Sequence, residues 1–430
     1  MERIANELRR RKSRAPLSLR KKSVSHQVPK AGDLKYSDER IDIRDLDQIL
    51  AIDPDRRICV AESGVTFVDL VAATLRHGLV PIIVPELKTI TVGGAVSGCS
   101  IESMSFRHGG FHDTCLEYEV ITARGEVLTC RPGGDDDLLF GMMHGTFGTL
   151  GILSRLTFQL IPAQPFVQMR YQQHDTLADY LAAIGDHIRS GRPDFVDGII
   201  HTADSWVLNL GTFVPEAPYT NRYDWLKIYY QSTRTRREDY LRTADYFFRY
   251  DRGVTNVHPR SLLGRLLLGK FLGSTQVLRL AEAFNGLMRT ESPTVILDVF
   301  VPFSQVPAFF DWYRGELDHF PLWCVPYRVP RPYPWLSPEF HARSGDRLFL
   351  DIAIYGLKQD GEKNCHALME QKLLELGGIK TLISHNYYSE QDFWRVFNKQ
   401  TYDAVKARTD PDHVFRDLYT KTCRAARGLR

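Results

Sequence analysis

The hydrophobic and polar positions of residues 58–163 follow two periods, and each period predicts its own kind of element. Apolar residues in Ile58–Ala61 predict a strand, and a helical pattern follows at Thr66–His77. Thr66 can cap this helix, with Asp69 three residues later, and Gly78 ends it. The apolar face of the helix consists of Phe67, Leu70, Val71 and Leu75.

A hairpin and an alternating strand complete this unit. Residues Glu117–Arg124 and Glu126–Cys130 read as two strands joined at Gly125, and a short helix is expected at Asp137–Met142. The strand that follows directs Leu156, Phe158 and Leu160 to one face and Arg155, Thr157 and Gln159 to the other. The unit is therefore α+β, and Ile161–Pro165 forms its natural boundary.

The pattern beyond residue 165 predicts a second sheet with covering helices. The expected strands are Val196–His201, Trp206–Gly211, Thr294–Val301 and Arg347–Tyr355, and the expected helices are Leu177–Ser190 and Val306–Leu317. Strands with helices of this kind suggest an antiparallel sheet covered on one face. Residues 381–430 contain aromatic helices that we expect to return to the first unit.

Two glycine-rich segments lie inside the first unit. Thr91–Ser103 (TVGGAVSGCSIES) follows an apolar strand at Val80–Val84, and Gly145–Gly151 (GTFGTLG) precedes the alternating strand. Glycines without a Cβ let backbone N–H groups approach a phosphate closely, although such glycines are more often plain turns. Two segments in one unit suit a long, bent ligand such as a dinucleotide. The G-x-G-x-x-G fingerprint before a helix is missing, which disfavours a Rossmann fold.

Composition and charge limit the remaining classes. The chain has 430 residues, of which 43% are hydrophobic and 25% charged, as in soluble globular proteins. Seven scattered cysteines without a C-x-x-C pair favour reduced thiols in a cytoplasmic compartment and no metal site. We expect no transmembrane helix and no signal peptide, since no apolar run approaches about 20 residues. Hydrolase motifs of the G-x-S-x-G or H-E-x-x-H type are absent.

Positive charge is concentrated at the start of the chain. Residues 1–30 contain ten Lys and Arg against two acids, while the whole chain has a net charge of +3. This arm can be a solvated helix and loop, or a patch for anionic lipid head groups at a membrane surface. Nucleic acid is disfavoured, because no binding motif accompanies the charge.

Several separate motifs give the chain a specific resemblance. They are Pro85-Glu86-Leu87, Thr91-Val92-Gly93-Gly94, Ile101-Glu102-Ser103, Tyr118-Glu119, Gly148-Thr149-Leu150-Gly151, Leu322-Trp323-Cys324-Val325-Pro326, Asp351–Gly356, Phe393-Trp394 and Tyr419…Lys421…Cys423–Arg427. The chain resembles the vanillyl-alcohol-oxidase (PCMH-type) flavoproteins and, among these, the Δ24-sterol reductases. The resemblance covers approximately residues 15–428.

The resemblance implies a fold, a cofactor and a division into four parts. These are the basic arm with the first pyrophosphate loop (1–30), a PCMH-type FAD-binding domain (31–163), an antiparallel-sheet substrate or cap domain (164–380), and C-terminal aromatic helices (381–430). FAD is expected to bind non-covalently, because Ala15–Gln27 has no glycine-histidine pair for a flavin linkage and His26 is its one histidine. The residues expected to contact FAD are Arg20, Thr91, Val92, Gly93, Gly94, Gly98, Ser100, Ile101, Ser103, His108, Gly109, His112, Gly148, Leu150, Gly151 and Ile152.

Four residues are candidates for catalysis. Tyr387 aligns with a tyrosine of the resembling family and is the first candidate for the proton donor, with a structural hydrogen bond as its alternative. Glu102 follows the first glycine segment and would face flavin or substrate, or else cap a loop N–H. Asp351 and Tyr355 alternate on one strand and would face the substrate, unless they form a buried pair within the sheet.

These expectations define an enzyme that reduces a carbon–carbon double bond of a hydrophobic lipid, with NADPH as reductant and a sterol Δ24 side chain as the leading substrate. An unsaturated or methylene fatty-acyl lipid is the first alternative, followed by an FAD-dependent alcohol oxidase or dehydrogenase. A non-enzymatic lipid-binding protein is the least favoured. Residues Ser261–Gly273 (SLLGRLLLGKFLG) have an amphipathic pattern that suits either a lipid interface or packing on the cap domain.

Overall fold

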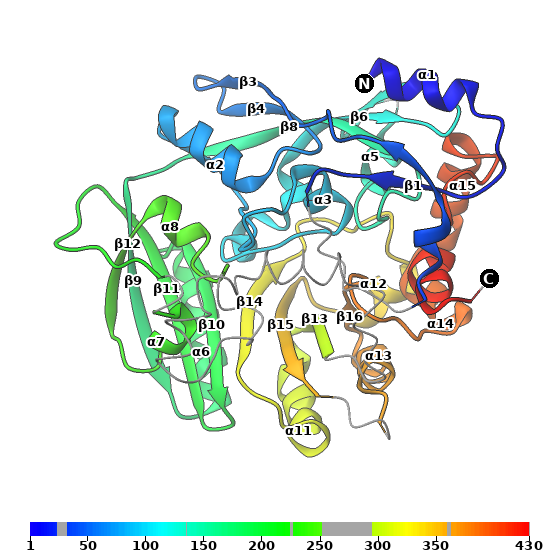
Figure 1. The fold of residues 1–430 in the computed structure, drawn as a ribbon. Helices are drawn as coiled ribbons and strands as arrows, with labels where there is room; N and C mark the ends of the chain where they lie inside the picture. Colours follow the sequence, from blue (N-terminus) through cyan, green and yellow to red (C-terminus); the bar gives the residue numbers. More distant parts are fainter. Residues whose placement is uncertain (24–31, 135, 224–226, 252–294, 359–362, 430) are drawn as a thin grey trace, which may run out of the picture.

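Two antiparallel sheets form the framework of the molecule. The computed structural model describes residues 1–430 except 24–31, 135, 224–226, 252–294, 359–362 and 430. The first sheet has the order β3-β4-β8-β6-β7, with β5 paired to β8. Its strands are β3 (Ile49–Asp53), β4 (Ile58–Glu62), β5 (Leu79–Pro81), β6 (Cys115–Ile121), β7 (Val127–Cys130) and β8 (Ile152–Pro162). The α+β class is confirmed, and this sheet lies in the upper part of Figure 1.

The second sheet has eight strands in the order β12-β9-β11-β10-β14-β15-β13-β16. They are β9 (Phe166–His174), β10 (Phe195–Thr202), β11 (Ser205–Val214), β12 (Glu238–Arg242), β13 (Val295–Pro302), β14 (Leu322–Arg328), β15 (Leu348–Leu357) and β16 (Ile379–Lys380). All pairs in the sheet are antiparallel. The four strands predicted from residues 196–355 are all present.

Three helices cover one face of the second sheet. They are α6 (Leu177–Ser190), α11 (Val306–Glu316) and α13 (Cys365–Leu376). Their buried side chains share a hydrophobic cluster with alternate residues of the central strands, such as Leu297 and Val299 of β13 and Ile352 of β15. Because side chains of a strand alternate between faces, the residues between them face the first sheet. The sheet therefore presents one helix-covered face and one face to the first unit (Figure 1).

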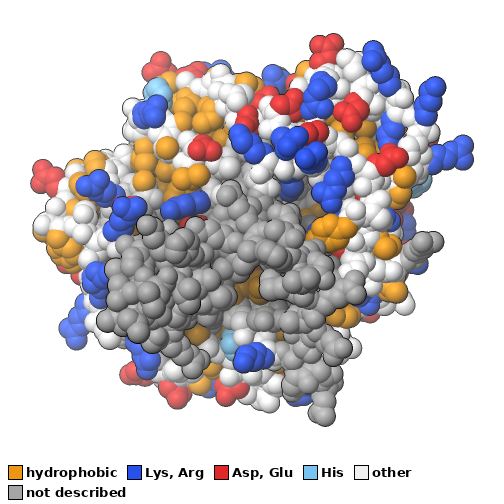
Figure 2. All heavy atoms as spheres, in the orientation of Figure 1, with side chains coloured by type: hydrophobic (Ala, Val, Ile, Leu, Met, Phe, Trp, Pro, Cys, Tyr) orange, Lys and Arg blue, Asp and Glu red, His pale blue; other side chains and the backbone are white. Residues whose placement is uncertain are grey.

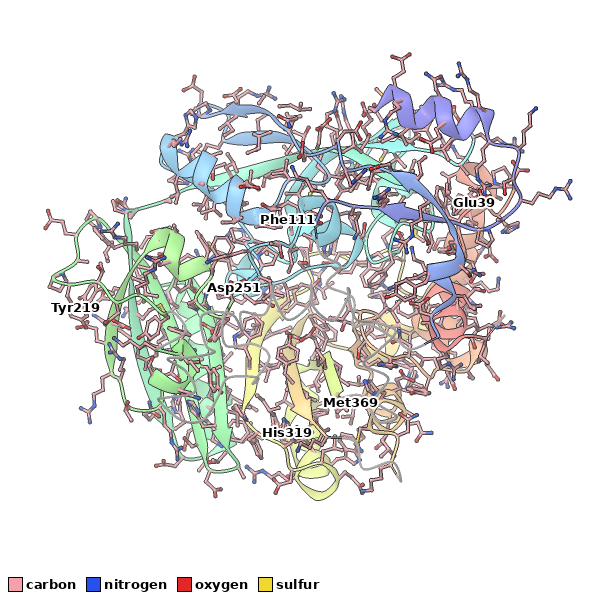
Figure 3. All side chains as sticks on the ribbon, in the orientation of Figure 1. Glu39, Phe111, Tyr219, Asp251, His319 and Met369 are labelled. Atoms are coloured by element: carbon pink, nitrogen blue, oxygen red, sulfur yellow. The ribbon has the colours of Figure 1, made fainter. Side chains whose placement is uncertain are left out.

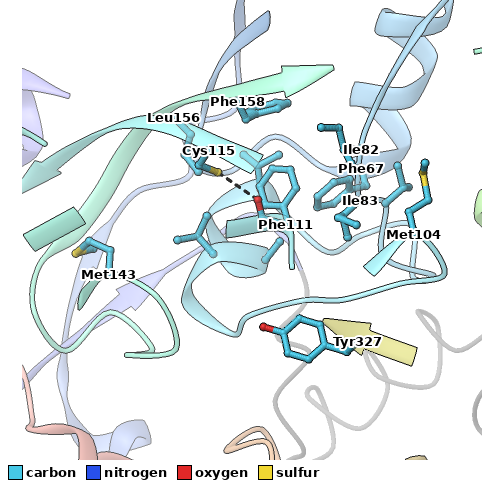
Figure 4. Packing of buried hydrophobic residues seen from close by; sticks show 14 of the residues in the cluster. Phe67, Ile82, Ile83, Met104, Phe111, Cys115, Met143, Leu156, Phe158 and Tyr327 are labelled. Atoms are coloured by element: carbon cyan, nitrogen blue, oxygen red, sulfur yellow. Dashed lines mark hydrogen bonds between the residues drawn. The ribbon is translucent and has the colours of Figure 1, made fainter. Parts of the chain in front are cut away.

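Aromatic packing holds the first unit together. Helix α2 (Phe67–Thr74) begins at Thr66, whose side chain accepts the N–H of Asp69, as the sequence predicts. Phe67 of this helix contacts Phe111 at 5.1 Å between ring centroids, and Phe111 lies 5.2 Å from Phe158 of β8. Figure 4 shows these three rings, together with the hydrogen bond that the Cys115 thiol donates to the Phe111 carbonyl.

The first twenty residues are packed into the fold, which differs from a solvated arm. Helix α1 (Glu2–Arg10) buries Ile4, Ala5 and Leu8 in a small hydrophobic cluster with residues of β6 and β8. Strand β1 (Leu17–Arg20) then pairs in parallel with β2 (Glu39–Asp42). Helix α1 has an apolar stripe although many of its neighbouring residues are arginines. Burial of this stripe holds the segment against the fold despite its polar composition. The packing fixes the position of Arg20.

The C-terminal part of the chain contains α14 (Glu390–Val396), α15 (Lys399–Thr409) and the π-helical turn Thr420–Arg424. Of these, α15 and the π-helical turn contact the second glycine segment. The Lys406 ammonium donates to the Thr149 carbonyl at 2.7 Å and forms an ion pair with Asp410 at 2.6 Å. The other α-helices of the described residues are α3 (Val92–Ser97), α4 (Ser105–His108), α5 (Asp137–Met142), α7 (Tyr229–Ser232), α8 (Thr243–Phe247) and α12 (Pro338–Ser344).

Two local predictions differ from the structure. The strand expected at Val80–Val84 is β5, which ends at Pro81, because proline cannot donate a ladder hydrogen bond and the chain turns away. The first glycine segment begins as the short helix α3 rather than as an open loop. Ser261–Gly273 lies outside the described residues. Across the described part of the chain, no helix has the length and hydropathy needed to cross a bilayer.

Candidate active site

A cavity of about 430 Å³ lies between the two glycine segments and the face of the second sheet opposite its helices. Its wall includes residues of β1, the N-terminal part of α3, the loop before β8, and strands β13, β14 and β15. The segment before residue 252 contacts the edge of this region, since the Asp251 carboxylate, labelled in Figure 3, accepts the N–H of Lys88 at 3.2 Å. The cavity therefore collects residues from nearly the whole length of the chain.

The first glycine segment lines the cavity through Thr91, Gly93, Gly94, Gly98, Ser100 and Ile101. Thr91 caps α3, and its hydroxyl accepts the N–H of Gly94 at 3.2 Å. A Cβ on Gly93 would lie 2.6 Å from the Cβ of Ser63, so the close packing of α3 against the residue that follows β4 requires glycine at position 93. Val92 is fully buried in the core and does not line the cavity.

The second glycine segment lies beside the C-terminal end of α3, where the Phe147 N–H donates to the Ser97 carbonyl at 3.2 Å, and it contributes Gly148 and Gly151 to the cavity wall. Both glycines have positive φ, at 70° and 151°, which side chains disfavour. Leu150 and Ile152 are fully buried in hydrophobic clusters rather than at the cavity wall. In this loop, glycines at the cavity wall alternate with apolar residues buried in the core, and this arrangement fixes the conformation of the loop.

Cations surround the part of the cavity near β1 and β2. They are Arg20, Lys21, Lys22, Lys35, Arg40, Arg44 and Lys421, which we call the basic group. Lys22 pairs with Asp47 at 2.5 Å, Arg44 with Asp42 at 2.6 Å and Lys35 with Asp33 at 3.3 Å, and the seven cations still outnumber these three acids. Figure 2 shows Lys and Arg side chains gathered on the upper half of this face of the molecule.

Lys421 is a half-buried member of the basic group. Its ammonium donates to the Phe147 carbonyl at 2.7 Å, which ties the C-terminal turn to the second glycine segment. Burial, together with the charges of Lys21 and Lys35, lowers the pKa of Lys421 to about 8. Excess cations beside a loop of small residues fit the diphosphate of a dinucleotide such as FAD.

Carboxyls occupy the part of the cavity formed by the second sheet. Glu86, Asp298 and Asp351 line the wall, and we call them the acidic group. The Tyr355 hydroxyl, also in the wall, donates to the Asp298 carboxylate at 2.7 Å. The register explains the cluster, because Asp298 pairs with Ala353, which lies between Asp351 and Tyr355 on β15.

Burial raises the pKa of every carboxyl in the acidic group. The pKa of Glu86 is raised to about 8 by burial and then by the negative charges of Asp298 and Glu102. Burial raises the pKa of Asp298 to about 6, against the hydrogen bond from Tyr355. Burial, with Asp298 and Glu86 nearby, holds the pKa of Asp351 well above its usual range. Glu86 and Asp351 are therefore favoured as neutral carboxylic acids near neutral pH, whereas Asp298 can carry the negative charge that raises the pKa of both.

Sequence reasoning missed Glu86 and Asp298 as site residues. Asp298 is a single acid inside the apolar strand VILDVFVP, as Asp351 is inside LFLDIAIYG. A lone carboxyl in an otherwise apolar strand is costly to bury, and that cost is a signal of a polar role. Glu86 belongs to the Pro85-Glu86-Leu87 motif, which by itself assigns no role to the carboxyl.

Glu102 is held by an ion pair away from the cavity wall. Its carboxylate lies 3.2 Å from the Arg249 guanidinium, which also lies 3.2 Å from Asp197. The Ser103 N–H and hydroxyl also donate to Glu102, and that hydroxyl lies 2.9 Å from Tyr246 Oη. Glu102 and Ser103 thus contribute to a buried network between the two units, and their predicted contacts with flavin or substrate stay predictions.

The remaining predicted site residues lie elsewhere. His112 is fully buried beside Asp113 at 3.2 Å, and Gly109 packs against the same aspartate, where a Cβ would lie 2.4 Å from its Oδ2. Neither these residues nor His108 lines the cavity. Tyr387 lies beneath the C-terminal turn and donates its backbone N–H to Glu370 at 3.0 Å. Its role as proton donor stays a prediction.

Comparisons with known proteins agree with this geometry. A family model described as an FAD binding domain matches residues 12–131, which include β1 and the first glycine segment. Delta(24)-sterol reductase of Homo sapiens is 25% identical over 423 residues, covering 93% of this chain and 80% of that protein. Delta(24)-sterol reductase of Arabidopsis thaliana is 25% identical over 433 residues, covering 89% and 76%.

A different relative matches a shorter stretch. Cytokinin dehydrogenase 7 of Oryza sativa subsp. japonica is 34% identical over 134 residues, which cover 30% of this chain and 25% of that protein. The sterol reductases match both sheets of the fold, because their similarity spans nearly all the chain. The resemblance inferred from the sequence is confirmed: the chain is an FAD-dependent oxidoreductase homologous to the Delta(24)-sterol reductases along nearly its whole length.

Proposed function

We propose that this protein reduces a carbon–carbon double bond of a hydrophobic lipid, with FAD as the cofactor and NADPH as the reductant. A sterol with a Δ24 double bond in its side chain is the leading substrate. The observation that carries the proposal is the composition of one cavity, in which a basic group beside two glycine segments meets an acidic group on the second sheet.

Each part of the cavity supports one requirement of the reaction. The basic group and the glycine segments would hold the FAD diphosphate, and FAD when bound supplies hydride transfer. Ile296, Phe300 and Trp323 give the sheet side of the wall apolar surface that suits a lipid. Saturation of an alkene also needs a proton at the second carbon, and neutral carboxyls are suited to supply it.

The length of the similarity favours a reductase over an alcohol dehydrogenase. The sterol reductases match about nine-tenths of this chain, including the sheet that carries the acidic group. Cytokinin dehydrogenase 7 matches less than a third. The similarity to the sterol reductases extends over the second sheet, and this extent supports reduction of a double bond.

Peripheral contact with a membrane is a further part of the proposal. A sterol or fatty-acyl substrate resides in a bilayer, and exposed Lys and Arg residues of the first twenty-two positions, such as Arg9, Arg10 and Lys12, would face anionic lipid. Co-sedimentation with vesicles containing phosphatidylserine tests this, and equal binding to neutral vesicles would contradict it.

An anaerobic flavin titration tests the reaction. The purified holoenzyme is expected to lose its visible flavin absorbance on addition of NADPH and to recover it on addition of desmosterol, a Δ24 sterol. Bleaching that only an unsaturated or methylene fatty-acyl lipid reverses would keep the reductase and reject the sterol. A flavin that NADPH leaves oxidised, with turnover on an alcohol in air, would reject the reductase.

A further inference from the structure

The acidic group has features that flavin binding does not explain. Glu86, Asp298 and Asp351 come from three separate segments and meet in the cavity wall, distant in sequence from the basic group. In the described residues, none of the three carboxyls forms an ion pair with a Lys, Arg or His side chain. Three unpaired carboxylates in one apolar wall would repel each other strongly, so the cluster must retain protons.

Asp351 is the member best suited to give a proton away. Its side chain is 2% exposed, and its Oδ1 has no hydrogen-bond partner among the described residues. Asp298 differs, because the Tyr355 hydroxyl already occupies its Oδ1. A buried carboxyl oxygen that has no hydrogen-bond partner in a cavity wall destabilises the protein unless a bound ligand supplies the partner.

We propose that Asp351 is the acid that protonates the substrate carbon, and that Glu86 and Asp298 are positioning residues that keep its proton in place. This inference rests on the proposed reduction of a double bond. The Asp351 O–H bond breaks, the electron pair of the double bond forms the new C–H bond, and Asp351 is left as a carboxylate. The hydride at the other carbon comes from NADPH by way of FAD, and solvent returns the proton to Asp351.

Electrostatics within the group supports these roles. The negative charges of Asp298 and Glu86 oppose ionisation of Asp351, whose Oδ1 has no hydrogen-bond donor among the described residues. Tyr355 holds Asp298 in position by its hydrogen bond. A neutral donor is thereby maintained at a pH where an exposed aspartate would be ionised.

The first test uses infrared spectroscopy of the holoenzyme without substrate. Wild type is expected to show a carboxylic-acid C=O band from Asp351 that persists at pH values where exposed carboxyls are ionised. Asp351→Asn should remove that component, whereas Asp311→Asn on the exposed side of α11 should retain it. A spectrum unchanged by Asp351→Asn would overturn the proposal, whether or not the enzyme reduces sterols.

The second test separates the two half-reactions. Asp351→Asn should leave the rate of flavin bleaching by NADPH unchanged and slow reoxidation by the olefin by about 100-fold or more, as expected for loss of a general acid. Asp311→Asn should change neither rate. Reoxidation of Asp351→Asn at the wild-type rate would overturn the proposal. Failure of every olefin to reoxidise wild type would overturn the proposed function instead, while the infrared result would still stand.

A further variant keeps the proposal testable if Asp351→Asn loses its flavin. Glu86→Gln removes one like charge and leaves Asp351 intact. The persistent infrared band should then disappear at a lower pH than in wild type, because the neighbouring negative charge that favours the protonated form is gone. An unshifted band would show that the two carboxyls do not interact and would overturn the positioning role of Glu86.

Discussion

At the residue scale, buried charges near the cavity are fixed by their neighbours. Lys421 donates to the Phe147 carbonyl inside the basic group, and burial lowers its pKa to about 8. Only the protonated ammonium attracts a diphosphate. We therefore expect FAD affinity to fall as pH rises through about 8 in wild type. Lys421→Met should weaken FAD binding about tenfold or more at pH 7, the scale of one lost charge-assisted contact of about 1.5–3 kcal/mol.

Two variants control this prediction in an FAD titration of the apoprotein. Lys421→Arg keeps its charge at every accessible pH, so its affinity should lose much of the decline between pH 7 and pH 9. Lys12→Met removes an exposed cation that does not line the cavity and should leave affinity unchanged. A pH profile identical in wild type and Lys421→Arg would show that Lys421 does not bind the diphosphate.

At the element scale, helix α1 is anchored on the hairpin between β6 and β7. Gly125 in that turn has φ of 73°, and a Cβ there would lie 2.2 Å from the Ala5 carbonyl oxygen of α1. Gly133 has a similar φ of 70° with nothing within 4 Å of such a Cβ. Gly125→Ala should therefore cost about 1–3 kcal/mol more unfolding free energy than Gly133→Ala, through the clash alone.

Denaturant unfolding of the two variants measures this difference, since both carry the same penalty for an alanine at positive φ. Gly125→Ala should also weaken FAD binding, because α1 leads directly to β1 and Arg20. Equal stabilities would mean that α1 does not pack on the turn in solution.

At the scale of the whole molecule, Arg249 joins the two units. Its guanidinium lies between Glu102 of the first unit and Asp197 of β10, and all three side chains are buried. Trp323, in the cavity wall, donates its indole N–H to the same Asp197 at 3.0 Å. Arg249→Met should cost about 3–5 kcal/mol at neutral pH, because two buried carboxylates lose their partner.

The loss of unfolding free energy in Arg249→Met should depend on pH. Burial already raises the pKa of Glu102, and loss of Arg249 raises it further, so the folded variant holds a proton on Glu102 that the unfolded chain releases near pH 4. The destabilisation should therefore be small near pH 4 and grow as pH rises towards 8. Adding Glu102→Gln and Asp197→Asn to Arg249→Met should recover stability at neutral pH. A loss independent of pH, measured by thermal unfolding, would contradict the network.

Local pattern predicted four strands of the second sheet, several elements of the first sheet and the presence of a flavin unit. Thr66 caps its helix as predicted, α6 has the predicted bounds, and Leu156, Phe158 and Leu160 are buried together on β8. The physical reason is that capping and periodicity depend on residues close in sequence. The glycine segments and the resemblance followed from the same local information.

The tertiary structure alone decided which polar residues share the cavity. Asp298 and Asp351 stand on paired strands, and Glu86 joins them from the loop after β5. Glu102 instead meets Arg249, a partner 147 positions away in the chain. Whether a carboxyl becomes an acid, an ion pair or a cap depends on the charges and the solvent around it, and those are fixed only when distant strands pack. The sequence therefore determined that a flavin fold forms, and long-range packing decided which of its acids line the cavity.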